Sequence, residues 1–241
     1  MLLTKTSNAN ATANPGSNGG RGPSATPPWP ARREASGLAF LTFDKAGEDW
    51  KAKFAKGKST DAKAAMLAAG CTYRDVKPLP PQKDKTNFHA DFPTLSSPTA
   101  GLWSTSPPSA GSHYGAWAVW GFYRAPVNPR QVVHNEEHGG VIIWWGPKFP
   151  KSTVDQLEGF YNQKPDGMLG TPYASLGNKI ALTAWTALPG SYYAKGNYGI
   201  GHIAVCSKFD QKAFAAFRSA YRGKGPEGVP LSADEPGMGP Q

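Results

Sequence analysis

An unbroken apolar run, VIIWW at residues 141–145, is bounded by glycine on both sides. Consecutive β-branched and aromatic residues between glycines predict a strongly buried strand. The segments 116–123 (AWAVWGFY) and 178–188 (NKIALTAWTAL) predict two further strands. The chain between AWAVWGFY and VIIWW contains NPRQVVHNEEHGG, which predicts a short helix, because Pro129 suits a first helical turn and Gly139 suits a helix end.

Helical patterns occur in three more segments: residues 46–70, 152–163 and 207–225. Ser152 or Thr153 is the predicted cap of the second of these helices. Residues 72–112 consist almost entirely of turn and loop chemistry, a length that is unusual inside a compact domain and is often functional. Strands and helices are mixed without a glycine-rich phosphate loop or a regular repeat, so the sequence predicts an α+β fold.

Glycine and proline are abundant, with 28 and 23 residues, and only 39% of the chain is hydrophobic. The 8 Trp, 9 Tyr and 11 Phe residues compensate, because each aromatic side chain buries a large area. We therefore expect one loop-rich domain with a small mixed or antiparallel sheet, flanking helices and an aromatic-rich core. Residues 1–35, rich in Ser, Asn, Gly and Pro, predict a disordered arm. Residues 36–225 form the predicted globular domain, and residues 226–241 form a predicted extended tail.

The net charge of +9 raises the question of an anionic partner. The basic residues are dispersed and no nucleic-acid motif accompanies them, so nucleic-acid binding is not expected. The basic surface and the amino-terminal arm instead suit an anionic surface or a protein partner. No run reaches the roughly 18 apolar residues of a membrane span. Residues 1–20 lack the apolar centre of a signal peptide, which leaves both a cytoplasmic location and export by another route open.

The chain has two cysteines, Cys71 and Cys206, and neither lies in a CxxC motif. In an oxidising compartment they would form one disulfide, whereas in a reducing cytosol they would be two buried thiols. A pair without a spare cysteine favours the disulfide.

The motif HNEEHGG at residues 134–140 holds two of the five histidines. On a helix, His134 and His138 share one face, with Glu137 beside them, so the three side chains could bind one cation. The string matches H-x-x-E-H, in which two histidines hold zinc and the glutamate is the general base of a hydrolase. Two glycines end the helix at once, where a peptidase needs it to continue. The other interpretation is a structural polar cluster, in which His138 and Glu137 bond loop backbones.

Two more histidines precede the motif. His113 lies in a loop constrained by Pro and Gly, from which it can reach into a site, and His89 has Asp91 close by in sequence. Imidazole is the commonest protein ligand of transition metals, so both are candidate ligands. His202 begins a predicted strand and is expected to be structural. Spacing alone suggests no Ser-His-Asp arrangement.

Four segments occur in the order and spacing of a known family: SPPSAGSHYGAWAVWGFY, VVHNEEHGGVIIWW, ALTAWTAL and FAAFRSAYRGKGPE. The chain from about Gly70 to Glu227 resembles a prokaryotic family of unknown function, number 3105. Its members are usually envelope proteins with one amino-terminal anchor and an extracytoplasmic domain, whereas this chain begins with a polar arm. The resemblance implies that the polar motif positions belong to one feature, namely His113, His134, Glu137, His138, Cys71 and His89.

Three hypotheses follow from these residues. The first is an extracytoplasmic domain that binds zinc or copper through His113, His134 and His138, with Glu137 as a ligand or as a partner that orients a histidine. We expect the orienting role. The second is a metal-dependent hydrolase in which Glu137 is catalytic. The third is a non-enzymatic assembly or binding protein of the envelope or of a multi-subunit particle, in which the motif is purely structural. Its basic surface and amino-terminal arm would then bind an anionic envelope polymer or a protein partner.

Overall fold

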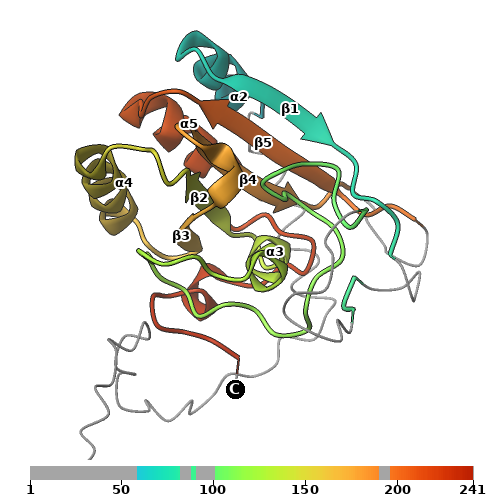
Figure 1. The fold of residues 1–241 in the computed structure, drawn as a ribbon. Coiled ribbons are helices and arrows are strands. Elements are labelled where there is room, and N and C mark those ends of the chain that lie inside the picture. Colours follow the sequence, from blue (N-terminus) through green and yellow to red (C-terminus); the bar gives the residue numbers. More distant parts are fainter. Residues whose placement is uncertain (1–58, 82–87, 91–100, 190–195, 241) are drawn as a thin grey trace, which may run out of the picture.

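The computed structural model describes residues 59–81, 88–90, 101–189 and 196–240 (Figure 1). They contain five strands: β1 (Thr72–Val76), β2 (Val141–Trp145), β3 (Met168–Pro172), β4 (Ile180–Thr186) and β5 (Ile200–Cys206). The four helices are α2 (Ser59–Ala68), α3 (Pro129–Glu137), α4 (Lys151–Gln163) and α5 (Gln211–Tyr221). Short 3-10 turns occur at Ala174–Leu176 and Leu231–Ala233. One mixed sheet has the order β1-β5-β4-β2-β3, in which only β2 and β3 run parallel.

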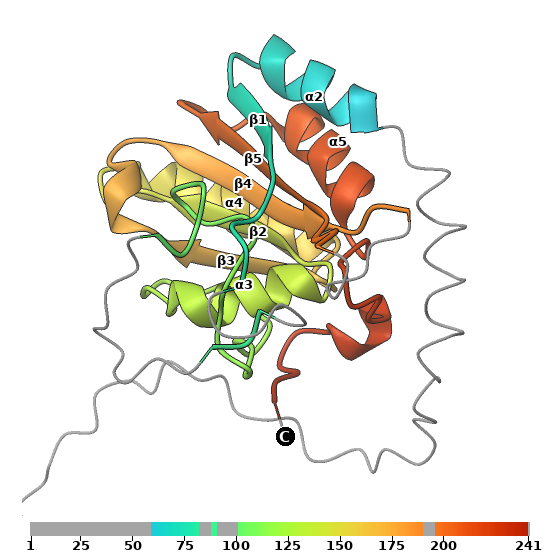
Figure 2. The same cartoon turned by 90° about the vertical axis from the view of Figure 1, so that its right-hand side faces the viewer.

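The sheet separates two apolar clusters, because alternate residues of a strand face opposite sides. Val141 and Ile143 of β2 pack in one cluster with residues of α2, α4 and α5. Ile142 and Trp144 pack in the other with Val132 of α3. Figure 2 shows α3 on the side of the sheet opposite α5. The predicted α+β fold, with a small mixed sheet and an aromatic core, is confirmed.

The strand predicted at residues 116–123 is wrong. Its backbone is bent, and it pairs with the sheet only at Phe122, which forms an isolated bridge with Gly170. Trp120 instead bonds the C-terminal segment, since its N–H donates to the Met238 carbonyl and its carbonyl accepts from the Gly237 N–H. The alternation of apolar residues therefore reflects the packing of Ala118 and Trp120 in the apolar cluster of α3 and β2, not membership of the sheet.

Two edge strands were missed by the sequence prediction. β1 lies inside residues 72–112, which were expected to be turn and loop, and most of its residues are exposed or half-buried. β3 has the sequence MLGTP, in which Gly and Pro argue against a strand. Both lie at an edge of the sheet, where polar residues and a proline are tolerated.

The helix termini agree only partly with the predictions. α3 begins at Pro129, and its C-cap residue His138 is followed by Gly139 at φ 106°, as predicted. α4 begins one residue before Ser152, after Pro150, and no side chain caps it, so the predicted Ser/Thr cap is wrong. α5 is capped by Asp210, whose carboxylate accepts from the Ala213 N–H at 3.0 Å. The first part of the helix predicted at 46–70 lies outside the described residues.

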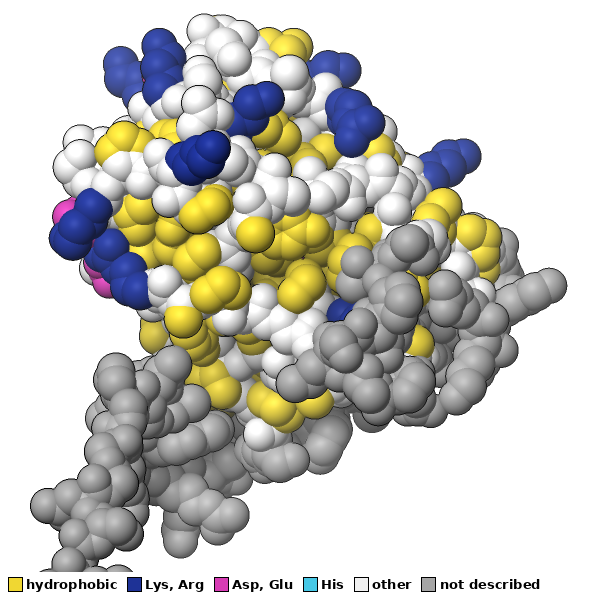
Figure 3. Space-filling model, viewed as in Figure 1, with side chains coloured by type: hydrophobic (Ala, Val, Ile, Leu, Met, Phe, Trp, Pro, Cys, Tyr) yellow, Lys and Arg dark blue, Asp and Glu magenta, His cyan; other side chains and the backbone are white. Residues whose placement is uncertain are grey.

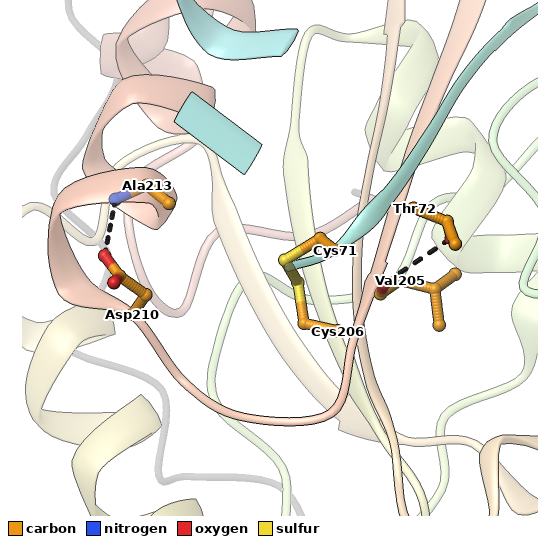
Figure 4. Close-up of a disulfide and its surroundings, with 6 residues drawn as sticks. All are labelled: Cys71, Thr72, Val205, Cys206, Asp210 and Ala213. Atoms are coloured by element: carbon orange, nitrogen blue, oxygen red, sulfur yellow. Dashed lines mark hydrogen bonds between the residues drawn. A yellow bond between two sulfur atoms is a disulfide. The ribbon is translucent and has the colours of Figure 1, made fainter. Parts of the chain in front are cut away.

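The two cysteines form the predicted disulfide (Figure 4), with Cα atoms 4.3 Å apart. Cys71 directly precedes β1, and Cys206 ends the neighbouring strand β5. Both cysteines are buried in the apolar cluster that also contains Met66 of α2 and Phe217 of α5. The bridge therefore fixes the edge strand and the preceding helix to the rest of the core.

The residues after α5 return to the domain, which differs from the extended tail expected at 226–241. Asp234 is completely buried, and its carbonyl accepts from the Gly167 N–H at 2.9 Å. Figure 2 shows this C-terminal segment, drawn in red, passing the end of α3. The arm expected at residues 1–35 lies outside the described residues.

The surface of the described residues has two features that bear on function. Figure 3 shows Lys and Arg side chains dispersed over one face, with hydrophobic side chains between them, so this face carries no continuous basic patch. Within the described ranges, no helix is both long enough and apolar enough to cross a membrane.

Candidate functional site

The motif on α3 directs its side chains into different surroundings. Asn135 clamps the preceding loop to the helix, since its side chain bonds both the N–H and the carbonyl of Ala118, at 2.9 and 2.8 Å. Glu136 faces the sheet, where the Thr183 hydroxyl donates to its carboxyl group. The remaining side chains of the motif, those of His134, Glu137 and His138, lie close to further histidines and carboxylates from other segments. The adjacent glutamates therefore have separate roles.

A short backbone pairing brings His89 beside His113. The His113 N–H donates to the Phe88 carbonyl at 3.0 Å, and the Ala90 N–H donates to the His113 carbonyl at 2.8 Å. The two imidazole rings are 5.2 Å apart between centroids, and His89 also stacks on His134 at 4.8 Å. Loop residues far apart in sequence thus place two imidazoles over the α3 histidine.

Backbone carbonyls fix the tautomers of His113 and His134. The Nδ1 atom of His113 lies 2.7 Å from the Gly111 carbonyl oxygen, and that of His134 lies 2.8 Å from the Tyr114 carbonyl oxygen. A carbonyl can only accept, so both Nδ1 atoms carry a proton. In the neutral imidazoles, each Nε2 atom then presents a lone pair, which is the arrangement found in metal-binding histidines.

Glu137 faces these imidazoles through Oε2. The distance from this oxygen to Nε2 is 2.9 Å for His113 and 3.6 Å for His89. His113, His134 and Glu137 are buried, whereas the side chain of His89 is 41% exposed. One ligand atom from each of the four residues lies within 4.8 Å of the other three. In a tetrahedral zinc site the ligand atoms lie about 3.3–3.5 Å apart, so small shifts would close this group around an ion.

His138 belongs to an adjacent group with two carboxylates. Its Nδ1 lies 3.3 Å from Oδ1 of Asp234, and its Nε2 lies 3.3 Å from Oε2 of Glu227. Nε2 of His134 is 3.9 Å from the same Glu227 oxygen. His134, His138 and Glu227 form a second set of three potential ligands, which shares His134 with the first set.

The two α3 histidines have opposite pKa shifts. Burial lowers the pKa of His134 to about 3, and the neighbouring His113 and His138 add to this effect. Burial also lowers the pKa of His138, but hydrogen bonds with Asp234 and Glu227 outweigh it and raise the pKa to about 9. His134 is therefore neutral at neutral pH, while the carboxylates favour a positive charge at His138.

Trp117 covers the α3 histidines from the preceding loop. Its ring centroid lies 5.4 Å from that of His134 and 4.7 Å from that of His138. The indole shields both imidazoles from water on this side, which strengthens their electrostatic interactions with the carboxylates.

His202 lies on another face of the sheet in a hydrogen-bonded network. Its Nδ1 donates to Asp75 at 2.6 Å, and its Nε2 accepts from the Thr186 hydroxyl at 2.7 Å. This Thr-His-Asp order has the geometry of a catalytic triad. Thr186 is only 2% exposed, so a substrate cannot reach its hydroxyl in this conformation. The network joins β1, β5 and β4, which agrees with the structural role predicted for His202.

The structure thus brings together His89, His113, His134 and Glu137 of the predicted residues. His138, predicted to share an ion with His113, lies instead in the adjacent group. Sequence reasoning missed Glu227 and Asp234, since both lie in the segment expected to be an extended tail. Their only signal was the presence of three acidic residues, Glu227, Asp234 and Glu235, in an otherwise glycine- and proline-rich stretch.

The fold and the site define a single α+β domain in which histidines and carboxylates from four parts of the chain gather around α3. The chain belongs to the family described as "Protein of unknown function (DUF3105)", whose model matches residues 99–233. The resemblance found in the sequence is therefore confirmed. No curated protein and no solved structure matches the chain.

Proposed function

We propose that the domain binds one transition-metal ion through His89, His113, His134 and Glu137. The observation that carries this proposal is the orientation of two buried imidazoles. The backbone holds the Nδ1 protons of His113 and His134, so their Nε2 atoms have lone pairs, and both residues lie in the group of potential ligands that includes Glu137. Two acceptors in close contact repel each other unless a positive charge lies between them, and a metal ion supplies it.

Zinc is the ion that the donor set suits best. Three imidazoles and one carboxylate are zinc ligands, and zinc tolerates the geometry that the protein imposes. Both cysteines are in the disulfide, so neither is available as a thiolate ligand, which the soft ion Cu(I) prefers. Cu(II) is the second choice, because it also binds imidazole.

A role in binding is preferred over metal-dependent hydrolysis. Glu137 lies against Nε2 of His113, the nitrogen that would face the ion, while backbone carbonyls orient the imidazoles through Nδ1. This contact supports a ligand role for Glu137 over the orienting role expected from the sequence. Four protein ligands complete a tetrahedral site, which leaves no position for a catalytic water.

We also propose that the domain works outside the cytoplasm. A buried disulfide persists in an oxidising compartment and is rare in the cytosol. The bridge between Cys71 and Cys206 therefore supports the location that is usual for the family.

Metal analysis of purified protein tests the binding proposal. The chain is purified without a histidine tag and dialysed against metal-free buffer, and its zinc and copper are measured by mass spectrometry. We expect one ion per chain, mainly zinc, and a lower melting temperature after chelation, because an ion that binds only the folded state stabilises it.

The matched control is the double variant His113→Ala/His134→Ala, with circular dichroism to verify its fold. We expect this variant to lose the zinc and to melt at the same temperature with and without chelator. Equal, low metal contents in the wild type and the variant, after incubation with zinc, would reject the proposal.

A further inference from the structure

We infer that the ion has a second, alternative position, formed by His134, His138 and Glu227, through which it enters and leaves the site. This inference rests on the proposed metal site. We call the first set of ligands (His89, His113, His134, Glu137) the inner position and the second set the outer position.

The outer position has the geometry of a metal site that a carboxylate supports. Asp234 is completely buried, and its Oδ1 lies 3.3 Å from Nδ1 of His138. A carboxylate that accepts the Nδ1 proton fixes the imidazole, and an ion that binds Nε2 takes the place of the proton that this nitrogen otherwise shares with Glu227. The Nε2 atom of His138 lies 3.3 Å from Oε2 of Glu227, and that of His134 lies 3.9 Å from the same oxygen.

The backbone holds Glu227 in place beside α3. The Glu227 N–H donates to the Glu137 carbonyl at 3.2 Å, and the Gly223 N–H donates to the Gly139 carbonyl at 2.8 Å. Glu227 is therefore fixed relative to His138 despite its position after the last helix. Its side chain is 31% exposed, so the outer position is in contact with solvent, as the inner position is at His89.

The two positions exclude each other because they share one nitrogen. Nδ1 of His134 is bonded to the Tyr114 carbonyl, which leaves only Nε2 as a donor to metal. One lone pair binds one ion, so a filled inner position leaves the outer position with His138 and Glu227 alone. The shared imidazole allows an ion to exchange ligands stepwise, from Glu227 and His138 to His113 and Glu137.

A zinc titration of variants tests this inference. Competition with a fluorescent chelator gives the number of ions and their affinity. In the wild type we expect one ion per chain. In His113→Ala/Glu137→Gln we expect one weaker ion, which disappears when Glu227→Gln is added. His89→Ala/Glu137→Gln provides the same test if the first variant does not fold, because the side chain of His89 is partly exposed.

The rate of metal exchange is the second readout. Glu227→Gln alone retains the inner ligands, so we expect nearly unchanged affinity but at least severalfold slower transfer of zinc to a chelator in excess.

Two ions per wild-type chain would overturn mutual exclusion. A complete loss of zinc in both folded inner-position variants, or a transfer rate unaffected by Glu227→Gln, would overturn the outer position while leaving the proposed function intact. A wild type that binds no zinc would instead reject the proposed function.

Discussion

The Nε2 atom of His113 lies 2.9 Å from Oε2 of Glu137, and both side chains are buried. Nδ1 of His113 already donates its proton to the Gly111 carbonyl, so in the neutral imidazole two acceptors face each other. Buried acceptors at this distance need a positive charge beside them. A proton between the two atoms would remove the repulsion in this pair alone. A metal ion would also bind His89 and His134, whose ligand atoms lie close to the same pair.

The adjacent glutamates of α3 give the sharpest test of this interpretation. Glu137→Gln removes the anionic ligand beside His113, and we expect zinc affinity to fall by more than about 100-fold, beyond the loss typical of partners that only orient a ligand. Glu136→Gln changes the next carboxyl group, which faces Thr183 on the other side of the helix. We expect this variant to retain wild-type zinc affinity by chelator competition.

Glu136→Gln also serves as the control for helix propensity and for the exchange of a carboxyl group for an amide, since both variants make the same substitution one residue apart. Burial raises the pKa of Glu136 well above its ordinary value, which favours the neutral carboxyl group that glutamine resembles. Equal zinc affinities in the two variants would show that Glu137 is not a ligand.

Much of the fold followed from local signals in the sequence, and the rest depends on long-range contacts. The apolar run of β2 and the Pro and Gly that bound α3 act locally, so the sequence predicted them. β3 contains Gly and Pro, and it is a strand because it pairs with β2. For the site, the spacing of His134 and Glu137 on α3 was sufficient. The partner of His138 was not predictable, because hydrogen bonds from Gly167 and Trp120 place the segment that carries Asp234.

The disulfide should make a large contribution to stability. Cys71 and Cys206 are 135 residues apart, so the bridge removes much conformational freedom from the unfolded chain. We expect Cys71→Ser/Cys206→Ser to lower the free energy of unfolding by roughly 2–5 kcal/mol in urea titrations. A reducing agent should destabilise the wild type and leave the double variant unchanged. A wild type that is indifferent to reduction would contradict the prediction.

Acid should weaken the network around His202. Burial lowers the pKa of this imidazole, although its hydrogen bond to Asp75 acts in the opposite direction; Tyr73, Tyr221 and Lys224 also surround the ring. The unfolded state therefore binds a proton more readily than the folded state. The stability contribution is complete above the unfolded pKa of about 6.5 and decreases as the pH falls below it, by up to about 1.4 kcal/mol per pH unit.

The matching variant is His202→Gln, which retains polar groups but does not titrate. Urea unfolding with chelator present, at pH 7 and pH 5.5, gives the measurement. We expect the variant to be less stable at pH 7 and to lose less free energy of unfolding than the wild type between the two pH values. Identical losses would assign the acid sensitivity to other groups.

Gly139 determines how closely the C-terminal segment approaches α3. Its φ is 106°, and an added Cβ would lie 2.8 Å from the Gly225 nitrogen and 2.9 Å from the Lys224 nitrogen. We expect Gly139→Ala to lower the free energy of unfolding by more than about 1–2 kcal/mol, the cost of a left-handed backbone alone, because the backbone contact adds to it. Gly159→Ala is the control. Gly159 is exposed within α4 with nothing near its Cβ position, so alanine should stabilise the helix by about 0.5–1 kcal/mol.

The clash of an alanine at position 139 with Lys224 and Gly225 also displaces the backbone that leads to Glu227. Gly139→Ala should therefore slow zinc transfer to a chelator, as Glu227→Gln does. Unchanged stability and an unchanged transfer rate in Gly139→Ala would show that the C-terminal segment does not depend on this close contact.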